Sequence, residues 1–221
     1  MLTCCGSVAP PPPPPPTAPS VPTEAVDPGA AVVTSDIGGL PEEAMGRAFK
    51  SLDGSVQSCL EDASGRSPTV GGSFTLKMRV GSDGKARWAY VSDSTLGDRE
   101  AERCVLDLVR EKQWPKPVGG DGLAERSYEL DARAKPVDLE EKWVKSAVTK
   151  ARENALHCRS GLSGKLRATA YIGSDGRVVA AAIVTPDEHF EEVADCVSDA
   201  IRKVRFGKVG KRMKLTFDLW W

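Results

Sequence analysis

The sequence has few of the residues that build most catalytic and metal sites. It contains two histidines, His157 and His189, and its six cysteines form no Cys-x-x-Cys motif. Zinc ribbons and thioredoxin-like redox sites are therefore unsupported. His157 directly precedes Cys158, but neighbouring residues of a helix point in different directions, so this pair is not expected to be a catalytic dyad. We expect a protein that is not an enzyme and that holds no cofactor or metal.

The chain also lacks a charge excess and a long apolar run. Its 30 Lys and Arg against 31 Asp and Glu give a formal net charge of −1, so no basic field would attract nucleic acid. The longest uncharged apolar run of the folded part, residues 178–184, is too short to cross a bilayer. Nucleic-acid binding and an integral membrane protein are therefore both disfavoured.

Proline is abundant near the N-terminus. Residues 10–16 are all proline, and Pro19, Pro22 and Pro28 follow. Such a run has no backbone donors and prefers the extended polyproline II helix. We predict a disordered proline-rich linker over residues 6–40. An inert spacer is favoured over a docking site for a proline-recognising partner.

The rest of the chain carries one pattern twice. The GSDG motifs at Gly81 and Gly173 lie 92 positions apart, and the same offset superimposes Cys104 on Cys196 and Trp114 on Phe206. It also superimposes two alternating apolar runs, which are Phe74, Leu76, Met78 and Val80 and then Leu166, Ala168, Ala170 and Ile172. A shared register over strand and helix periods indicates a duplicated domain.

Each copy reads as helix, strand, strand, helix and strand, with an Asp-Gly hairpin turn. The predicted fold is α+β, with tandem domains over residues 41–133 and 137–221. The first helix of copy one begins near Pro41, and the last strands lie near residues 126–131 and 212–219. The apolar stripes of the first helices are Met45, Phe49, Leu52, Val56 and Cys59, and Leu139, Trp143, Ala147, Ala151, Ala155 and Cys158.

The four inner cysteines suggest disulfides. Each copy has one cysteine on each of its two helices, so Cys59–Cys104 and Cys158–Cys196 are the natural pairs. A closed loop of about 45 residues contributes roughly 4 kcal/mol on the chain-entropy model. Such pairs in small domains favour an oxidising compartment.

Two stretches carry a family resemblance. "SDSTLGDREAERCV" followed by "WPKP" resembles the C-terminal domain of AgmX/PglI-type gliding-motility proteins, which is similar to the C-terminal domain of TonB energy transducers. The resemblance covers residues 41–133 and 139–219, and copy two departs from it where Gly207 follows Phe206. It implies two TonB-C-like domains that act as a periplasmic binding module behind a proline-rich spacer. It does not imply energy transduction.

The first five residues resemble the end of a bacterial lipoprotein signal. In "MLTCCGS" either Cys4 or Cys5 would receive the lipid, with Cys5 slightly preferred. The charged start and apolar stretch of such a signal would have to lie upstream of Met1. We expect a lipoprotein of the bacterial periplasm, anchored in the outer membrane.

Two groups of residues are candidates for binding. Basic residues surround the last strand of copy two, which is expected to be a sheet edge open to β-augmentation; they are Arg205, Lys208, Lys211, Arg212 and Lys214. They would bind an envelope protein, an anionic glycan or a lipid head group, unless their role is to protect the edge from aggregation. Trp88 and Tyr90, which share a strand face, are the second candidates, with core packing as their alternative role.

The expected function is therefore non-catalytic binding in the bacterial cell envelope. The alternative is a structural or accessory scaffold of a gliding-motility or TonB-like trans-envelope machine.

Overall fold

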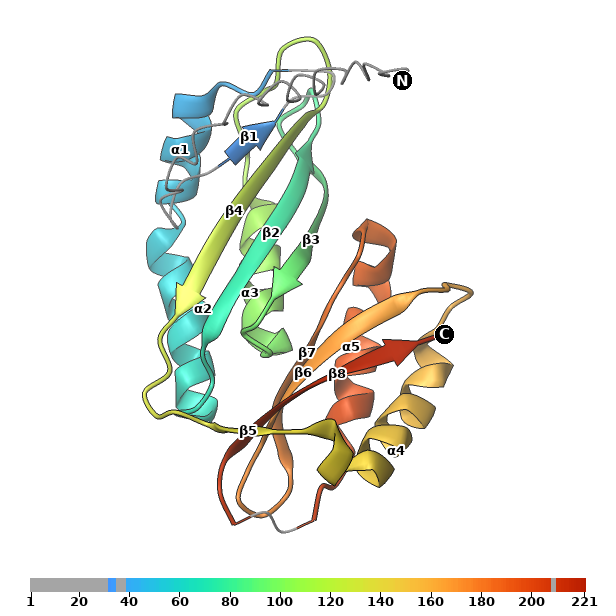
Figure 1. Cartoon of the computed structure of the whole chain (residues 1–221). Helices are drawn as coiled ribbons and strands as arrows, with labels where there is room; N and C mark the ends of the chain where they lie inside the picture. The colour runs from blue at the N-terminus through green and yellow to red at the C-terminus, as the bar shows by residue number, and fades with distance from the viewer. Residues whose placement is uncertain (1–31, 35–38, 208–209) are drawn as a thin grey trace, which may run out of the picture.

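The computed structural model describes residues 32–34, 39–207 and 210–221. Within them the chain is α+β, with two four-stranded sheets and five α-helices (Figure 1). The first half contains α1 (Glu42–Lys50), α2 (Asp53–Arg66) and α3 (Arg99–Glu111), and the second contains α4 (Lys145–Ala155) and α5 (Glu188–Arg202). None of the helices in these residues is long and apolar enough to span a membrane.

The two sheets have the same spatial order of strands. The first runs β1-β4-β2-β3 and the second β5-β8-β6-β7. Their strands are β1 (Val32–Thr34), β2 (Gly72–Val80), β3 (Ala86–Ser94) and β4 (Gly122–Leu130), and then β5 (Val137–Leu139), β6 (Lys165–Ile172), β7 (Val178–Val184) and β8 (Met213–Trp220). The copies differ at the outer strand, since β1 pairs antiparallel with β4 whereas β5 pairs parallel with β8.

The repeat extends to single hydrogen bonds. Gly84 and Gly176 occupy equivalent hairpin turns, both with φ of 80°, a backbone conformation that favours glycine. The backbone N–H of Trp114 donates to the Gly84 carbonyl at 2.8 Å, and that of Phe206 donates to the Gly176 carbonyl at 2.9 Å. In both halves the aromatic residue after the long helix is thus attached to the hairpin, as the 92-residue offset predicts.

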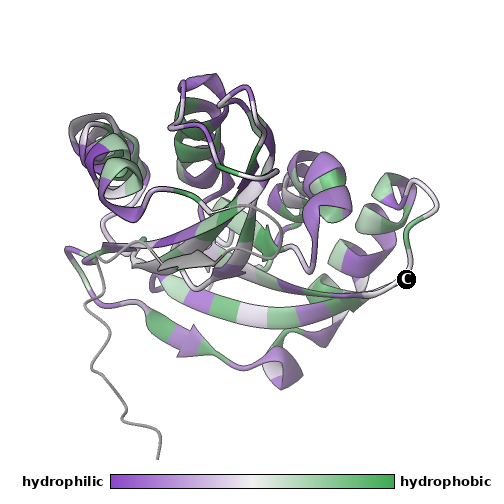
Figure 2. Cartoon of the chain, turned by 90° about the horizontal axis from the view of Figure 1, so that it is seen from above, coloured by the Kyte–Doolittle hydropathy of each residue, from purple (hydrophilic) through white to green (hydrophobic). Residues whose placement is uncertain are grey.

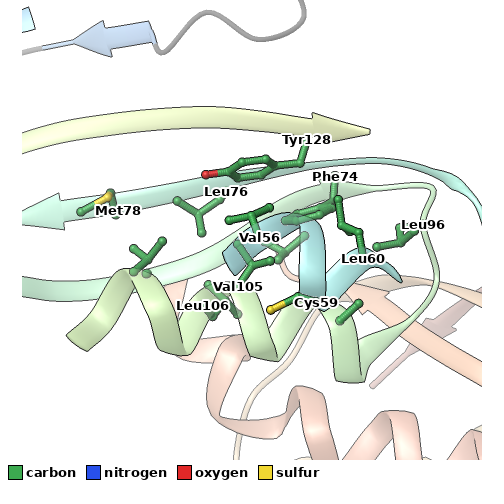
Figure 3. Packing of buried hydrophobic residues seen from close by; sticks show 14 of the residues in the cluster. Val56, Cys59, Leu60, Phe74, Leu76, Met78, Leu96, Val105, Leu106 and Tyr128 are labelled. Carbon is green, nitrogen blue, oxygen red and sulfur yellow. The ribbon is translucent and has the colours of Figure 1, made fainter. Parts of the chain in front are cut away.

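Each half has a hydrophobic core between its sheet and its helices. In the first core, Val56 and Leu60 of α2 and Leu106 of α3 pack on Phe74 and Leu76 of β2 (Figure 3). Seen from above, the helices gather on one side of the strands, and hydrophilic positions cover much of their outer surface (Figure 2). The opposite face of the first sheet is therefore free to carry polar and aromatic side chains.

The disulfide prediction is confirmed. Cys59 is bonded to Cys104 with the Cα atoms 5.8 Å apart, which joins α2 to α3. Cys158 is bonded to Cys196 with the Cα atoms 5.7 Å apart, which joins the 3₁₀ turn Leu156–Cys158 to α5. Each bond closes a loop within one half, so neither joins the two copies.

Several predicted elements need correction. The single helix expected from Pro41 to Cys59 is two helices, because the chain turns at Ser51 and Leu52 between α1 and α2. Leu139 lies in β5, and Trp143 lies in a 3₁₀ turn with 73% of its surface exposed. Val144 takes the buried position expected for Trp143, and the buried stripe of α4 continues through Val148 and Ala151.

Two further expectations concern the N-terminal segment. Strand β1 lies inside the predicted linker of residues 6–40 and pairs with β4. The proline run, Cys4 and Cys5 lie outside the described residues, so the structure does not bear on the linker before β1 or on the lipid anchor.

Candidate binding site

A groove lies on the face of the first sheet opposite its helices. Trp88 and Tyr90 of β3 lie side by side along it, with ring centroids 5.6 Å apart. The groove has a volume of about 280 Å³ and is lined mainly by apolar surface, and Leu123 of β4 and Glu188 of α5 are among its lining residues. Trp88 is only half-buried. Tyr90 is buried, with 8% of its surface exposed, so the half-buried Trp88 offers the larger share of the pair's surface to a ligand.

Charged groups surround the aromatic pair. Lys77 of β2 forms an ion pair with Glu125 of β4 at 3.5 Å, and both line the groove. Burial raises the pKa of the Tyr90 hydroxyl, and the nearby carboxylates of Glu188, Asp187 and Glu125 raise it further. Tyr90 therefore stays protonated at neutral pH and can donate a hydrogen bond to a ligand.

The equivalent face of the second half is already covered. The positions that match Lys77, Arg79, Trp88 and Tyr90 are Thr169, Tyr171, Ala180 and Ala182, and all four are buried. The first half covers them: the Tyr171 hydroxyl donates to the Gly71 carbonyl at 2.6 Å, and Tyr171 and Ala180 join the first hydrophobic core. The duplicated face is thus covered in the second copy, whereas Lys77, Arg79 and Trp88 of the first copy keep part of their surface exposed.

The two sheet faces differ in how they are covered because the segments before α3 and α5 differ. Residues 95–98 form a loop in the first half, and Gly97 in it lies against Thr169, so that a Cβ at this position would come within 2.5 Å of the Thr169 Cγ2 atom. In the second half α5 begins at Glu188, so the residues that match Leu96 and Gly97 are the first helical turn, Glu188 and His189. Leu96 is fully buried, whereas its counterpart Glu188 is only partly buried and His189 is exposed. Glu188 of this charged turn lines the groove on the first sheet's face, and the groove remains open.

The basic residues of copy two differ in their surroundings. Arg205, Lys211 and Arg212 are exposed, and Lys208 lies outside the described residues. Lys214 instead holds the two halves together, since its ammonium group donates to the Thr95 carbonyl at 2.7 Å and lies 5.3 Å from the centre of the Tyr171 ring. Lys214 is therefore a structural residue of the interface between the halves.

The expectation that the last strand is a sheet edge is wrong over residues 213–215. There β8 pairs with β5, and the Val137 N–H donates to the Arg212 carbonyl at 3.1 Å. Further along, the Arg152 side chain donates to the Asp218 carbonyl at 2.9 Å. A three-residue strand and one arginine thus use backbone groups that β-augmentation would require.

A charged contact between α3 and α5 was missed at the sequence level. The Arg99 side chain, 8% exposed, forms ion pairs with Glu191 at 2.6 Å and Asp195 at 2.7 Å. Burial opposes the charge of Arg99, but the hydrogen bonds to Glu191 and Asp195 raise its pKa above the usual range. Arg103 pairs with Asp195 at 3.5 Å.

The repeat offset was the signal that could have revealed this contact. Arg99 matches Glu191 and Arg103 matches Asp195, so each arginine binds its own counterpart. A residue at a two-fold axis contacts its own copy, and two identical copies would bring like charges together there. The halves thus pack like the subunits of a two-fold dimer whose axial residues have opposite charges.

The cysteine–histidine cluster of the second half offers no nucleophile. The Nε2 atom of His157 lies 3.5 Å from the Cys158 sulfur and 3.6 Å from the Cys196 sulfur. Both sulfurs are in the disulfide, so they provide neither a thiolate nor a metal ligand. Asp83 and Asp175 accept hydrogen bonds from the backbone N–H groups of Lys85 and Arg177 in the hairpin turns, which is a structural role.

Comparison with known proteins leaves the site without a precedent, because no protein-family model, curated protein or solved structure matches this chain.

Proposed function

We propose that the chain is a non-catalytic binding module of the bacterial cell envelope and that the groove over Trp88 and Tyr90 is its binding surface. The observation that carries this proposal is the unequal use of the duplicated face. In the second half four side chains of that face are small or buried against the first half. In the first half the matching positions carry Lys77, Arg79, Trp88 and Tyr90, of which Lys77, Trp88 and Tyr90 line a groove of about 280 Å³.

The chemistry of the groove suits a polypeptide partner. Aromatic side chains supply large contact areas at low conformational cost, and their polar ends orient a ligand. A groove of this size holds a few residues of an extended segment rather than a large cofactor. We therefore favour an envelope protein over the anionic glycan or lipid that the basic residues suggested.

The proposed envelope location is supported by the two disulfides. Bonds of this kind form and persist in oxidising compartments such as the periplasm. The tandem AgmX/PglI and TonB-C-like assignment is consistent with the repeated strand order β4-β2-β3 and β8-β6-β7. Lipid attachment at Cys4 or Cys5 belongs to the same proposal, and so does the alternative of a scaffold in a trans-envelope machine.

A capture experiment with three baits tests the function. The wild-type chain, a Trp88→Ala/Tyr90→Ala variant and a Lys211→Gln/Arg212→Gln control are immobilised and exposed to envelope extract of the source cell. We expect a retained protein that the wild type and the control share and that the aromatic variant loses at least tenfold. Equal retention by the wild type and the aromatic variant would remove the groove as the binding surface, and loss with the control would return the basic residues to first place.

A further inference from the structure

The groove presents hydrogen-bond donors beside its aromatic faces. Among the described residues, the Trp88 indole N–H and the Tyr90 hydroxyl have no hydrogen-bond partner, whereas the buried Trp114 indole donates to the Val109 carbonyl at 2.8 Å. Tilted aromatic rings with free donors between them are the chemistry that recognises polyproline II segments, whose carbonyls point outward and whose rings pack on aromatic faces. The chain itself carries seven consecutive prolines at residues 10–16, a sequence that favours this conformation.

The start of β1, the first described residue after the proline run, lies close to the groove. Val32 at the start of β1 pairs with Glu125 of β4, which lines the groove. Glu125 pairs with Lys77 of β2, and Lys77 pairs in turn with Tyr90 of β3. Neighbouring strands lie about 4.8 Å apart, so Glu125 and Tyr90 are roughly 10 Å from each other across the sheet. Residues 17–31 separate β1 from the proline run and could span up to roughly 45 Å when extended. The connection is therefore long enough to let residues 10–16 turn back onto the groove.

We propose that the chain's own proline run, residues 10–16, docks in the Trp88–Tyr90 groove as a polyproline II helix. The inference rests on the proposed function and adds its regulation, because a partner must displace the proline run to reach the aromatic pair. Short flexible connections give effective concentrations of the order of mM. A contact with a dissociation constant of about 1 mM is thus half occupied within the chain, and proline loses little conformational entropy on docking.

Hydroxyl-radical footprinting of the full chain tests the contact, with oxidation of each tryptophan measured by mass spectrometry. Three proteins are compared: the wild type, a Pro11→Ser/Pro13→Ser/Pro15→Ser variant and a matched Pro19→Ser/Pro22→Ser/Pro28→Ser control. We expect Trp88 oxidation to rise at least threefold in the first variant and to stay unchanged in the control. Trp220, which is 58% exposed, is the internal reference and should be oxidised equally in all three.

The opposite result is equally clear. If Trp88 oxidation is the same in all three proteins, the proline run does not occupy the groove and the proposal is overturned. A synthetic heptaproline peptide added at several mM to the serine variant should restore the protection of Trp88, and a failure to do so also counts against it. Neither result alters the capture experiment, in which dependence on Trp88 and Tyr90 decides the proposed function by itself.

Discussion

At the scale of single residues, Glu102 has the most unusual environment. It is fully buried in α3, its Oε1 atom accepts a hydrogen bond from the Ser94 hydroxyl at 2.6 Å, and its Oε2 atom has no partner within the described residues. Burial raises its pKa to about 8, although the Ser94 hydrogen bond and the Arg99 charge oppose the shift. The carboxyl group is therefore largely protonated at neutral pH.

This pKa predicts how stability changes with pH. The folded chain binds the Glu102 proton up to about pH 8, whereas an unfolded glutamate loses it near pH 4.5. Stability therefore falls as pH rises from about 5 to 8, because the folded state holds more protons there. Glu102→Gln should flatten this fall and raise the free energy of unfolding at pH 8. The control Glu111→Gln, on the exposed end of α3, should leave the pH dependence of stability unchanged. Urea unfolding at several pH values measures both, and an unaltered slope in Glu102→Gln would contradict the assignment.

Gly97 permits a second prediction at this scale. Its φ is 66°, and a Cβ would come within 2.5 Å of the Thr169 Cγ2 atom in the other half. Gly161 has a similar φ of 79° with nothing near its Cβ position. Both Gly→Ala changes lower stability because alanine is strained in the left-handed backbone conformation, but only Gly97→Ala also disturbs the contact between the halves. We expect Gly97→Ala to cost about 1–3 kcal/mol more than Gly161→Ala in urea unfolding; equal costs would mean that the loop does not press on Thr169.

At the scale of elements, the sequence predicted the repeated parts and missed the parts that exist only through tertiary contact. The hairpins, α3 and α5 follow from the 92-residue offset, because period-two and helical patterns recur along each copy, and both disulfides follow from the presence of one cysteine on each predicted helix. Strands β1 and β5 have three residues each, too few for any period, and form only because β4 and β8 offer backbone partners. Trp143 was expected in the core because residue type alone does not distinguish an exposed indole from a buried one.

The candidate site divides in the same way. Trp88 and Tyr90 could be selected because they break the repeat, standing where the second copy has Ala180 and Ala182. The groove itself could not be foreseen, since one of its lining residues, Glu188, comes from the other half. The role of Lys214 also depends on the other half, whose Thr95 carbonyl it binds.

The α3–α5 contact makes a prediction about charge. Arg99→Glu places a third carboxylate beside Glu191 and Asp195 and should cost about 3–5 kcal/mol of stability. The exchange Arg99→Glu/Glu191→Arg should recover part of this loss; the recovery is partial because Asp195 also contacts the Arg99 position. Urea unfolding of both single variants and the double variant gives the coupling energy. Additive losses in the double variant would show that the two side chains do not interact.

At the scale of the whole molecule, the halves resemble two subunits fused in one chain. Each half has its own disulfide and core, yet Tyr171 of the second half lies in the core of the first. The Val91 carbonyl of β3 also accepts from the Thr185 hydroxyl at 2.8 Å. We therefore expect that each half folds by itself and that the two folded halves then associate.

Separately produced halves test this organisation. We expect oxidised residues 41–133 and 137–221 each to fold and, when mixed, to form a one-to-one complex, because the ion pairs of α3 and α5 and the buried face around Tyr171 are then restored. Analytical ultracentrifugation at tens of µM detects the complex, and Arg99→Glu in the first half should abolish it. Folded halves that stay apart would show that the connection, rather than the interface, holds them together.

The binding surface is the central claim, and site-specific photo-cross-linking in the source cell tests it most directly. A benzophenone amino acid replaces Trp88 in one strain and Thr149, an exposed residue of α4, in a second. The account predicts a discrete cross-linked protein from position 88 that is absent from position 149. No adduct at position 88, or the same adducts at both positions, would contradict a partner bound in the Trp88–Tyr90 groove.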